Sequence, residues 1–363
     1  MFYHILRKIV AVAAVVCGIA VADAVEPTWS IDFGSVFDNR EGDEGMNEAR
    51  TFFFTTLAPE FGLRFSPKDR IAGGAVWTQP LENGVKDGKV IPTLYYRHES
   101  DTWKFSMGMF PRTQLREPLP GFLWCDSLAY FQRNIRGALV QYNHRHGFFD
   151  AYIDWRAMQS ETRREAFNIV FHGEWRPKSK VFLTGAHAQM NHLAKTKNAP
   201  EGQSVVDNFL VNPYVGLDFS RATALDSLVV KAGALATIER DRRFGGWKTP
   251  AGLWVDAIFE WRFLGLRNSL YAGGKLFPLY SEYGSLLYQG ESYYRSDFYN
   301  RTDIYARIFD NRYLDLQAQL NFNFAKGNFI FYQRLILNIH LDGVFGRGRN
   351  SRHSALKTVS FSF

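Results

Sequence analysis

The chain has 363 residues, a formal net charge of +7 and 16% aromatic residues. Of its two cysteines only Cys125 lies beyond the first 24 residues, which excludes an internal disulfide or a cysteine-based metal site in the rest of the chain. A mild positive balance is typical of a solvated surface, and it would favour anions only where the charges line a pore.

The first 24 residues have the pattern of a secretory signal peptide. Basic residues precede an apolar run over 9–22, and residues 22–24 read Ala-Asp-Ala, a small-x-small cleavage site. The run is shorter than the ~20 residues of a membrane-spanning helix. We expect cleavage after Ala24, with Ala22 as the alternative. Val16 stands before Cys17 where a lipoprotein signal needs a small residue, which argues against a lipoprotein.

From residue 25 onward the chain alternates between apolar and polar residues, and the clearest example is 314–324. Its even positions are Leu, Leu, Ala, Leu, Phe and Phe, and its odd positions are Asp, Gln, Gln, Asn and Asn. A period of two indicates a β-strand, because successive side chains point to opposite faces. The stretch is long enough for the ~9–11 residues of a tilted transmembrane strand.

The same alternation predicts the other strands. In chain order the predicted segments are 29–34, 51–65, 71–77, 90–98, 102–110, 135–143, 148–157, 164–175, 181–190, 205–219, 228–238, 253–263, 268–276, 303–309, 314–324, 328–341 and 359–363. A single-chain bacterial barrel has an even number of strands. We therefore expect one false segment between 277 and 341 and about sixteen strands, with fourteen and eighteen as alternatives.

The connections between these segments alternate in length. Short turns are predicted at 66–69, 99–101, 145–147, 176–179 and near 264, and longer loops at 39–48, 79–89, 111–133, 191–203, 240–248 and 277–300. Alternation alone would also fit a soluble sandwich with its apolar rows inside. Short turns on one side and long loops on the other favour a transmembrane barrel, with apolar rows facing lipid, turns in the periplasm and loops outside the cell.

Together these features resemble the outer-membrane β-barrel proteins of Gram-negative bacteria, and porins in particular. The stretch 33–40 is similar to the first strands of porin-type barrels. The last segment, with Val359, Phe361 and Phe363 on one face, resembles the C-terminal signal read by the barrel-assembly machinery.

The resemblance implies an all-β fold, a transmembrane antiparallel barrel over residues 25–363 that follows a signal peptide over 1–24. It implies export to the cell outer membrane and contact with outer-membrane lipid, lipopolysaccharide and the barrel-assembly machinery. It leaves a homotrimer open, and it implies neither a nucleic-acid partner nor a cofactor.

Charged residues on the predicted inner face are the candidate pore-lining groups. They are Arg97, Asp150, Asp154, Arg156, Arg164, Lys231, Asp256, Glu260, Arg262, Asp303, Arg307 and Arg334. Some of them would set a transverse field at a constriction and filter solutes by charge. In the alternative interpretation they pair across strands and keep the interior hydrated.

The loop 111–133 is too apolar to extend into water. Its candidate constriction residues are Phe122, Trp124, Asp126, Phe131 and Arg133. They would fold into the lumen as a constriction or pack at a subunit interface. The tyrosines of 280–299 likewise have two interpretations: an aromatic girdle at the membrane interface, or a stacking surface for sugars and other organic solutes.

An enzyme is the alternative class of protein. The available bases are His144, His146, His172, His187, His192, His340 and His353, and none stands at a Ser/His/Asp or metal-ligand spacing. We therefore expect no enzyme and no catalytic, metal or cofactor site. The expected function is a porin-like channel for passive diffusion of small hydrophilic solutes; the alternatives are a barrel component of a secretion or surface-assembly system and an outer-membrane barrel enzyme.

Overall fold

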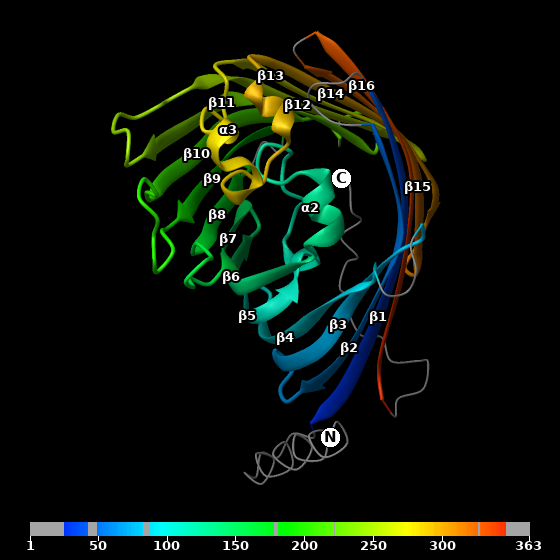
Figure 1. The fold of residues 1–363 in the computed structure, drawn as a ribbon. Helices are drawn as coiled ribbons and strands as arrows, with labels where there is room; N and C mark the ends of the chain where they lie inside the picture. The colour runs from blue at the N-terminus through cyan, green and yellow to red at the C-terminus, as the bar shows by residue number, and fades with distance from the viewer. Residues whose placement is uncertain are drawn as a thin grey trace.

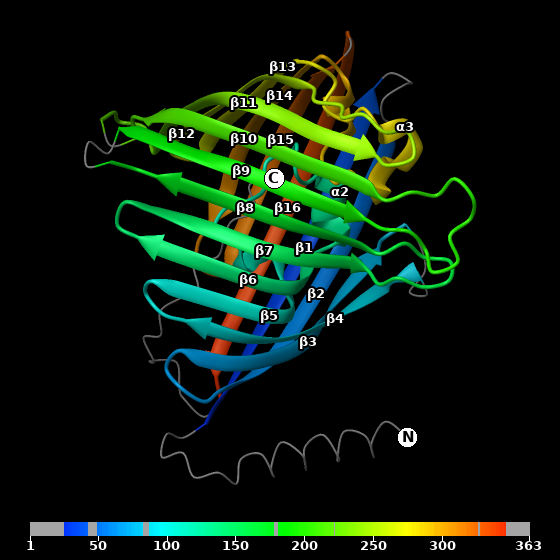
Figure 2. The same cartoon turned by 90° about the vertical axis from the view of Figure 1, so that its left-hand side faces the viewer.

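The computed structural model describes residues 25–42, 49–82, 87–177, 181–220, 222–325 and 327–345. In this part of the chain sixteen antiparallel strands form one closed barrel (Figure 1). Each strand pairs with its neighbours in the chain, and the first pairs with the last, from Thr28 opposite Val344 to Gly42 opposite Ile330. Seen from the side, the strands are strongly tilted (Figure 2).

The strands follow one another around the barrel in chain order. They are β1 (Glu26–Gly42), β2 (Arg50–Arg64), β3 (Asp69–Pro80), β4 (Lys89–Glu99), β5 (Trp103–Pro111), β6 (Asn134–His144), β7 (Gly147–Ala157), β8 (Ala166–Trp175), β9 (Phe182–Leu193), β10 (Val206–Asp218), β11 (Ser227–Asp241), β12 (Ala251–Trp261), β13 (Leu264–Gly273), β14 (Phe298–Asp310), β15 (Leu314–Ala325) and β16 (Asn328–Val344). The helical segments are η2 (Arg112–Gln114), α2 (Asp126–Phe131), α3 (Tyr280–Tyr283), η3 (Gly284–Leu286) and η4 (Ser292–Arg295).

The first sixteen predicted segments each overlap one strand, so the antiparallel sixteen-strand barrel is confirmed. The expected false segment between 277 and 341 is wrong, because 303–309, 314–324 and 328–341 all lie in strands. The seventeenth segment, 359–363, carries the assembly-signal residues Val359, Phe361 and Phe363 and lies outside the described residues, as does the signal peptide over 1–24. The described strands close without it.

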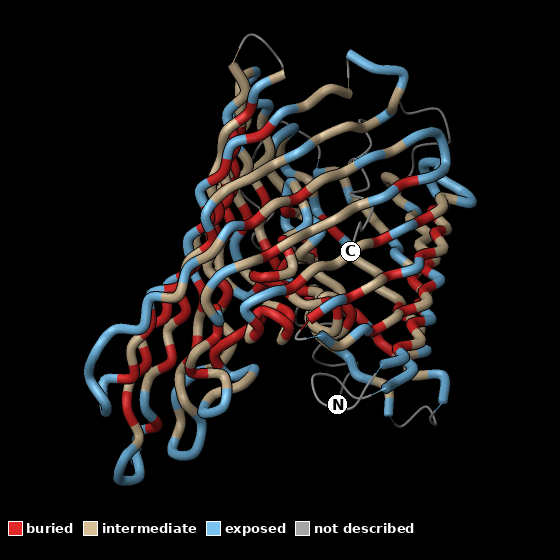
Figure 3. The backbone as a smooth tube through the Cα atoms, turned by 90° about the horizontal axis from the view of Figure 1, so that it is seen from above, coloured by how far each residue is buried: buried red, intermediate tan, exposed pale blue. Residues whose placement is uncertain are grey.

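The barrel wall is apolar outside and polar inside. In β15 the side chains of Leu320 and Phe324 are 42% and 45% exposed, whereas those of Gln319 and Asn321 are 3% and 0% exposed. The same alternation of buried and exposed positions runs around the wall (Figure 3). In a membrane the outward rows meet hydrocarbon and the inward rows are shielded from it.

The described part of the chain contains no helix that is both long and apolar enough to span a membrane.

Two long connections fold into the barrel. One is 112–133, which contains α2, and the other is 274–297, which contains α3 (Figure 1). Apolar side chains from both segments are fully buried against the inner wall, among them Phe122, Leu123 and Tyr293. The lumen therefore contains a packed apolar core of its own, which the two segments (here the first and second inward segments) supply.

We expect Leu320→Arg to destabilise the barrel by about 2–4 kcal/mol, because a charge in the middle of an outward row would face hydrocarbon. Urea unfolding of the protein refolded into liposomes measures the loss. Asp101→Arg in the exposed turn between β4 and β5 adds an arginine away from the wall and serves as control. Equal unfolding midpoints for the two variants would mean that this row does not face lipid.

Candidate functional site

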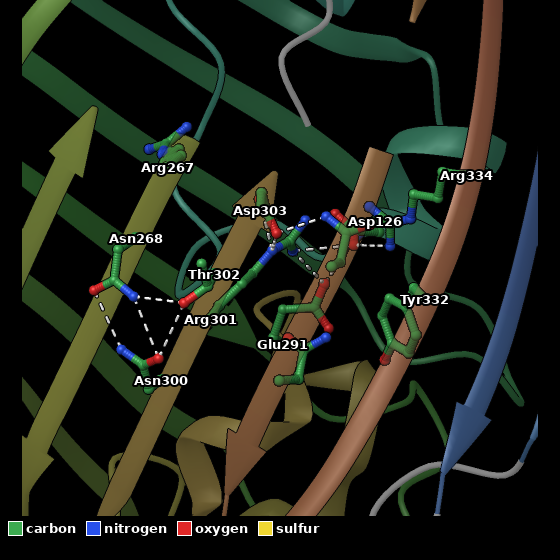
Figure 4. Close-up of polar contacts among 12 residues, drawn as sticks. Asp126, Arg267, Asn268, Glu291, Asn300, Arg301, Thr302, Asp303, Tyr332 and Arg334 are labelled. Atoms are coloured by element: carbon green, nitrogen blue, oxygen red, sulfur yellow. Dashed lines mark hydrogen bonds and ion pairs between the residues drawn. The ribbon is translucent and has the colours of Figure 1, made fainter. Parts of the chain in front are cut away.

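The first inward segment is fixed to the wall by a buried carboxylate. Asp126, the first residue of α2, accepts hydrogen bonds from Arg334 on β16 and from Arg301 on β14, the latter at 3.0 Å (Figure 4). Arg301 also binds Asp303 at 2.8 Å. Although burial alone would raise it, the two guanidinium groups hold the pKa of Asp126 well below its usual range. Asp126 is therefore ionised and tied to two strands.

The second inward segment is bound to the first at the same point. The Glu291 carboxylate accepts a hydrogen bond from the backbone N–H of Asp126 at 2.9 Å, and the Cys125 N–H donates to the Gln289 carbonyl at 2.7 Å. Burial and the neighbouring Asp126 carboxylate raise the pKa of Glu291 to about 7. Within this pair the arginines favour the ionised form of Asp126, whereas burial beside Asp126 favours the protonated form of Glu291.

The other end of α2 is held by β1. Asp38 accepts a hydrogen bond from the Tyr130 hydroxyl at 2.9 Å, two from the Arg40 guanidinium at 2.8 and 2.9 Å, and forms an ion pair with Arg334 at 3.2 Å. The short helix is therefore clamped at both ends by charges from β1, β14 and β16. A six-residue helix has little stability of its own, so these contacts fix its position.

Most of the candidate pore-lining residues lie on the inner face of the wall. On strands, Arg97, Asp150, Asp154, Arg156, Lys231, Asp256, Glu260, Asp303, Arg307 and Arg334 point inward. Many of them are paired: Asp154 binds Arg112 at 2.6 Å, Lys231 binds Glu174 at 2.8 Å, and Glu260 binds Arg307. Such pairs satisfy the charges locally, as in the second interpretation of these residues.

Two of the candidates lie outside the strands. Arg262 is exposed in the turn after β12 and has a φ of 55°, because the strand ends at Trp261 and the alternation does not continue past it. Arg164 precedes β8 and donates to the carbonyl oxygens of Ala194 and Ser204 at 2.6 and 2.5 Å. Arg164 therefore joins neighbouring connections at the rim.

The candidate constriction residues lie within the lumen. Phe122, Trp124 and Asp126 are buried there, and Phe131 and Arg133 are half-buried. The tyrosines do not form a girdle at the membrane interface, because the second inward segment and the start of β14 place them inside the barrel. Their interpretation as a stacking surface stays a prediction, and two of them border the cavity described below. Tyr288, Tyr293, Tyr294 and Tyr299 are buried in the lumen core instead of lying at the membrane interface.

A cavity of about 110 Å³ remains between the first inward segment and the wall of β13 and β14. Arg267, Arg301 and Asp303 line it from the wall, and Leu119 and Trp124 from the segment. Nowhere in the described ranges are three or more His, Cys, Asp or Glu side chains grouped so that they could hold a metal ion.

A second polar feature lies on the outer face, where long connections join β7 to β12. Neighbouring strands contribute one residue each to a continuous cross-strand row: Trp155, Phe167, His192, Asp207 and Arg240. We call these five residues the outward row. Their chain neighbours Asp154, Leu193, Val206 and Glu239 are buried, so the row points away from the lumen.

Aromatic stacking and ion pairs organise the outward row. The Phe167 ring stacks between Trp155 and His192, with ring centroids 4.8 Å apart on each side. Asp207 accepts hydrogen bonds from Arg240 at 2.9 Å and from Arg242 at 2.7 Å, and the Arg240 guanidinium lies 4.5 Å from the centre of the Trp247 ring. The Asp207 carboxylate thus binds the guanidinium groups of Arg240 and Arg242, so that this cluster of three side chains has a net positive charge.

Sequence reasoning missed the outward row because strand register creates it. His192 was among the available bases, but its neighbour Asp207 follows a long connection, and no linear motif joins the two. Glu291 was missed for a similar reason, because nothing in the pattern of 277–300 indicated that this loop turns inward. A signal for His192 did exist: it falls on the apolar face of a strand.

We expect Asp126→Asn to destabilise the protein by about 3–5 kcal/mol, because it would leave Arg301 and Arg334 buried without their shared counter-charge. Guanidinium unfolding of the protein in detergent, followed by intrinsic fluorescence, measures the loss. Asp101→Asn removes an exposed carboxylate and should leave the midpoint unchanged. An unaltered midpoint for Asp126→Asn would contradict the role of this contact.

Comparison with solved structures identifies the fold. OprD from Pseudomonas aeruginosa aligns with a TM-score of 0.50 at 10% identity, covering 88% of this chain and 94% of that one. A second OprD structure gives 0.51 at 9% identity, with 87% and 95% covered, and OprB from Pseudomonas putida gives 0.50 at 10% identity, with 87% and 94% covered. At such identities the likeness shows the fold alone, which is that of outer-membrane barrels and confirms the porin-like architecture.

Comparison at the sequence level gives a different indication. A search of curated proteins finds no match to this chain. A family model described as Lipid A 3'-O-deacylase-type matches residues 24–347. The expectation that the chain is not an enzyme is therefore wrong, because the matching family is described by an enzymatic activity. On the strength of a match that spans nearly the whole barrel, the chain belongs to the Lipid A 3'-O-deacylase-type family.

Proposed function

We propose that this protein is an outer-membrane hydrolase that removes an ester-linked acyl chain from lipid A, and that the outward row is its reaction site. Family membership supports the activity. The position of the row supports the site, because an acyl ester lies between headgroup and hydrocarbon and is reached from the outer face of the barrel. His192 with Asp207 beside it is the observation that carries this assignment.

In the proposed reaction His192 is the general base. Its imidazole takes a proton from a water molecule, and the oxygen of that water adds to the ester carbonyl carbon. The tetrahedral intermediate then expels the sugar oxygen, which takes the proton back from His192. The products are a free fatty acid and a sugar hydroxyl, so that atoms and charge balance.

The neighbouring groups have matching roles. Arg240 and Arg242 would hold the anionic headgroup and stabilise the oxyanion of the intermediate, since two guanidinium groups share one Asp207 carboxylate. Trp155 and the exposed Trp247 suit the boundary between lipid tails and headgroups, where tryptophan is enriched. The Phe167 ring stacked on His192 would limit the orientations of the imidazole.

We expect the purified protein to release one fatty acid from lipid A in mixed micelles, measured by mass spectrometry of the lipid product. His192→Ala should reduce the rate by about 10²–10⁴-fold, the usual contribution of a general base. The matched control is His144→Ala, which removes a histidine near the short turn between β6 and β7. Full activity in His192→Ala, or loss of activity in the control, would place the reaction elsewhere.

A second candidate function is passage of small hydrophilic solutes through the lumen. The inward rows favour it, because they are polar and charged around the wall and border a cavity. The two inward segments would set the size limit, and the charged groups would set the charge preference. A component of a secretion or surface-assembly system, the third class considered, would instead act through a protein partner.

We expect planar-bilayer recordings of the purified protein to show small, ohmic current steps with a mild preference for anions. Asp126→Asn should enlarge the steps, because it loosens the attachment of the first inward segment to the wall. Asp101→Asn controls for the change of net charge. A complete absence of steps would remove the channel as a function while leaving the hydrolase proposal intact.

A further inference from the structure

The cavity inside the barrel combines a mostly apolar lining with arginine side chains. Neither hydrolysis at the outward row nor simple diffusion requires this combination. We propose that it is a binding site for one small monocarboxylate that carries an apolar body. The inference goes beyond both functions above. It concerns reversible binding in the lumen, whereas His192 lies on the outer face of the barrel. Three properties of the cavity support it: its size, its mostly apolar lining and the long contacts between Arg267 and Asp256.

The size of the cavity sets the size of the ligand. About 110 Å³ is available. An engineered apolar cavity of ~150 Å³ binds benzene, and a single water needs only ~10–15 Å³. The space therefore fits a ligand of roughly one aromatic ring or a short aliphatic chain. A whole lipid or an oligosaccharide is excluded.

One side of the cavity is mostly apolar, although the first inward segment also contributes Arg112, Glu117, Asp126 and Arg133 to the lining. The first inward segment contributes Leu115, Leu119, two prolines and Trp124, and the Arg112 guanidinium lies 3.8 Å from the centre of the Trp124 ring. Tyr294 and Tyr299 border the cavity from the other side. Such a lining favours an apolar ligand body by removing its surface from water.

The opposite side carries two arginines on neighbouring strands. Arg267 on β13 is opposite Asp303, and Arg301 on β14 is opposite Ser269, so that the two guanidinium groups are diagonal neighbours on the inner face. Arg301 is neutralised by Asp126 at 3.0 Å and Asp303 at 2.8 Å. Arg267 differs, because its contacts with Asp256 measure 3.3–3.4 Å.

Those contacts are longer than the ~2.7–2.9 Å of a good charge-assisted hydrogen bond. The Arg267 side chain is also 27% exposed, and in Figure 4 it lies apart from the group around Asp126. Arg267 therefore retains the capacity to bind a second carboxylate. Burial lowers the pKa of Arg133, which borders the same cavity, so an anion there would also offset the cost of burying that cation.

The charge pattern selects a single carboxylate over other anions. A planar carboxylate matches the fork of a guanidinium group. Asp303 is already bound by Arg301 and Asn321, whereas Glu117 also borders the cavity and repels each negative charge of a ligand, so that a ligand with a single charge is repelled least. A phosphate or a dicarboxylate would place a second negative charge beside Glu117 in a mostly apolar space.

The test compares benzoate with its neutral analogue benzamide by isothermal titration calorimetry on the purified full-length protein in detergent. We expect benzoate to bind and benzamide to bind at least about tenfold more weakly, because a hydrogen bond to a charged group contributes that much. Arg267→Gln should weaken benzoate by a similar factor and abolish the discrimination. Leu119→Trp, which fills the cavity, should abolish binding of both.

Arg307→Gln is the matched control, since Arg307 lies inward on β14 but does not border the cavity. It should bind benzoate as the unaltered protein does, and so should His192→Ala, which separates this inference from the hydrolase proposal. Equal affinity for benzoate and benzamide, unchanged affinity in Arg267→Gln, or no benzoate binding at millimolar concentration would overturn it. A folded Leu119→Trp protein that still binds benzoate would overturn it as well.

Discussion

The structure depends on one constraint: a backbone N–H or C=O group cannot be left unpaired in hydrocarbon. A closed barrel meets this constraint, because every strand has a partner on both sides. Here closure requires β1 to pair with β16 along almost the whole length of both strands. Once the ring is closed, the two faces of every strand are fixed, with apolar rows toward lipid and polar rows toward the lumen.

The same constraint determines what the lumen must contain. Polar inward rows are stable only if their charges find partners, so the wall contains cross-strand ion pairs such as Lys231 with Glu174. The two inward segments add both apolar and charged contacts to this interior. Asp126 joins the two kinds of contact, because it binds arginines of the wall while its helix packs aromatic side chains.

The strands were predictable because their information is local. In 314–324 apolar and polar residues alternate, which predicts the face that each side chain occupies. In the structure the polar residues are buried on the inner face, as this alternation predicts. Strand ends were less predictable: a loop was expected from Asn39, but β1 continues to Gly42 because β16 pairs with it that far. Asp126 was identified as a constriction candidate from its loop, whereas Glu291, its partner, was not, because only the fold brings 291 beside 126.

The outward row illustrates the limit of linear motifs in a barrel. His192 and Asp207 become neighbours through register, and the register is set by β9 and β10 over their whole length. A reaction site built in this way has no fixed spacing in the sequence. The family model matches residues 24–347 as a whole, so its match does not depend on a short linear motif, whereas a search for a triad spacing does.

The pairing of β1 with β16 also has a consequence for biogenesis. The two strands lie at opposite ends of the described chain, so their contact closes the longest loop in the molecule and is entropically costly to form early. Until it forms, β1 and β16 each present an open edge that can recruit other polypeptides. Closure of the barrel must therefore wait until synthesis has passed β16, and the two open edges need protection from aggregation until then.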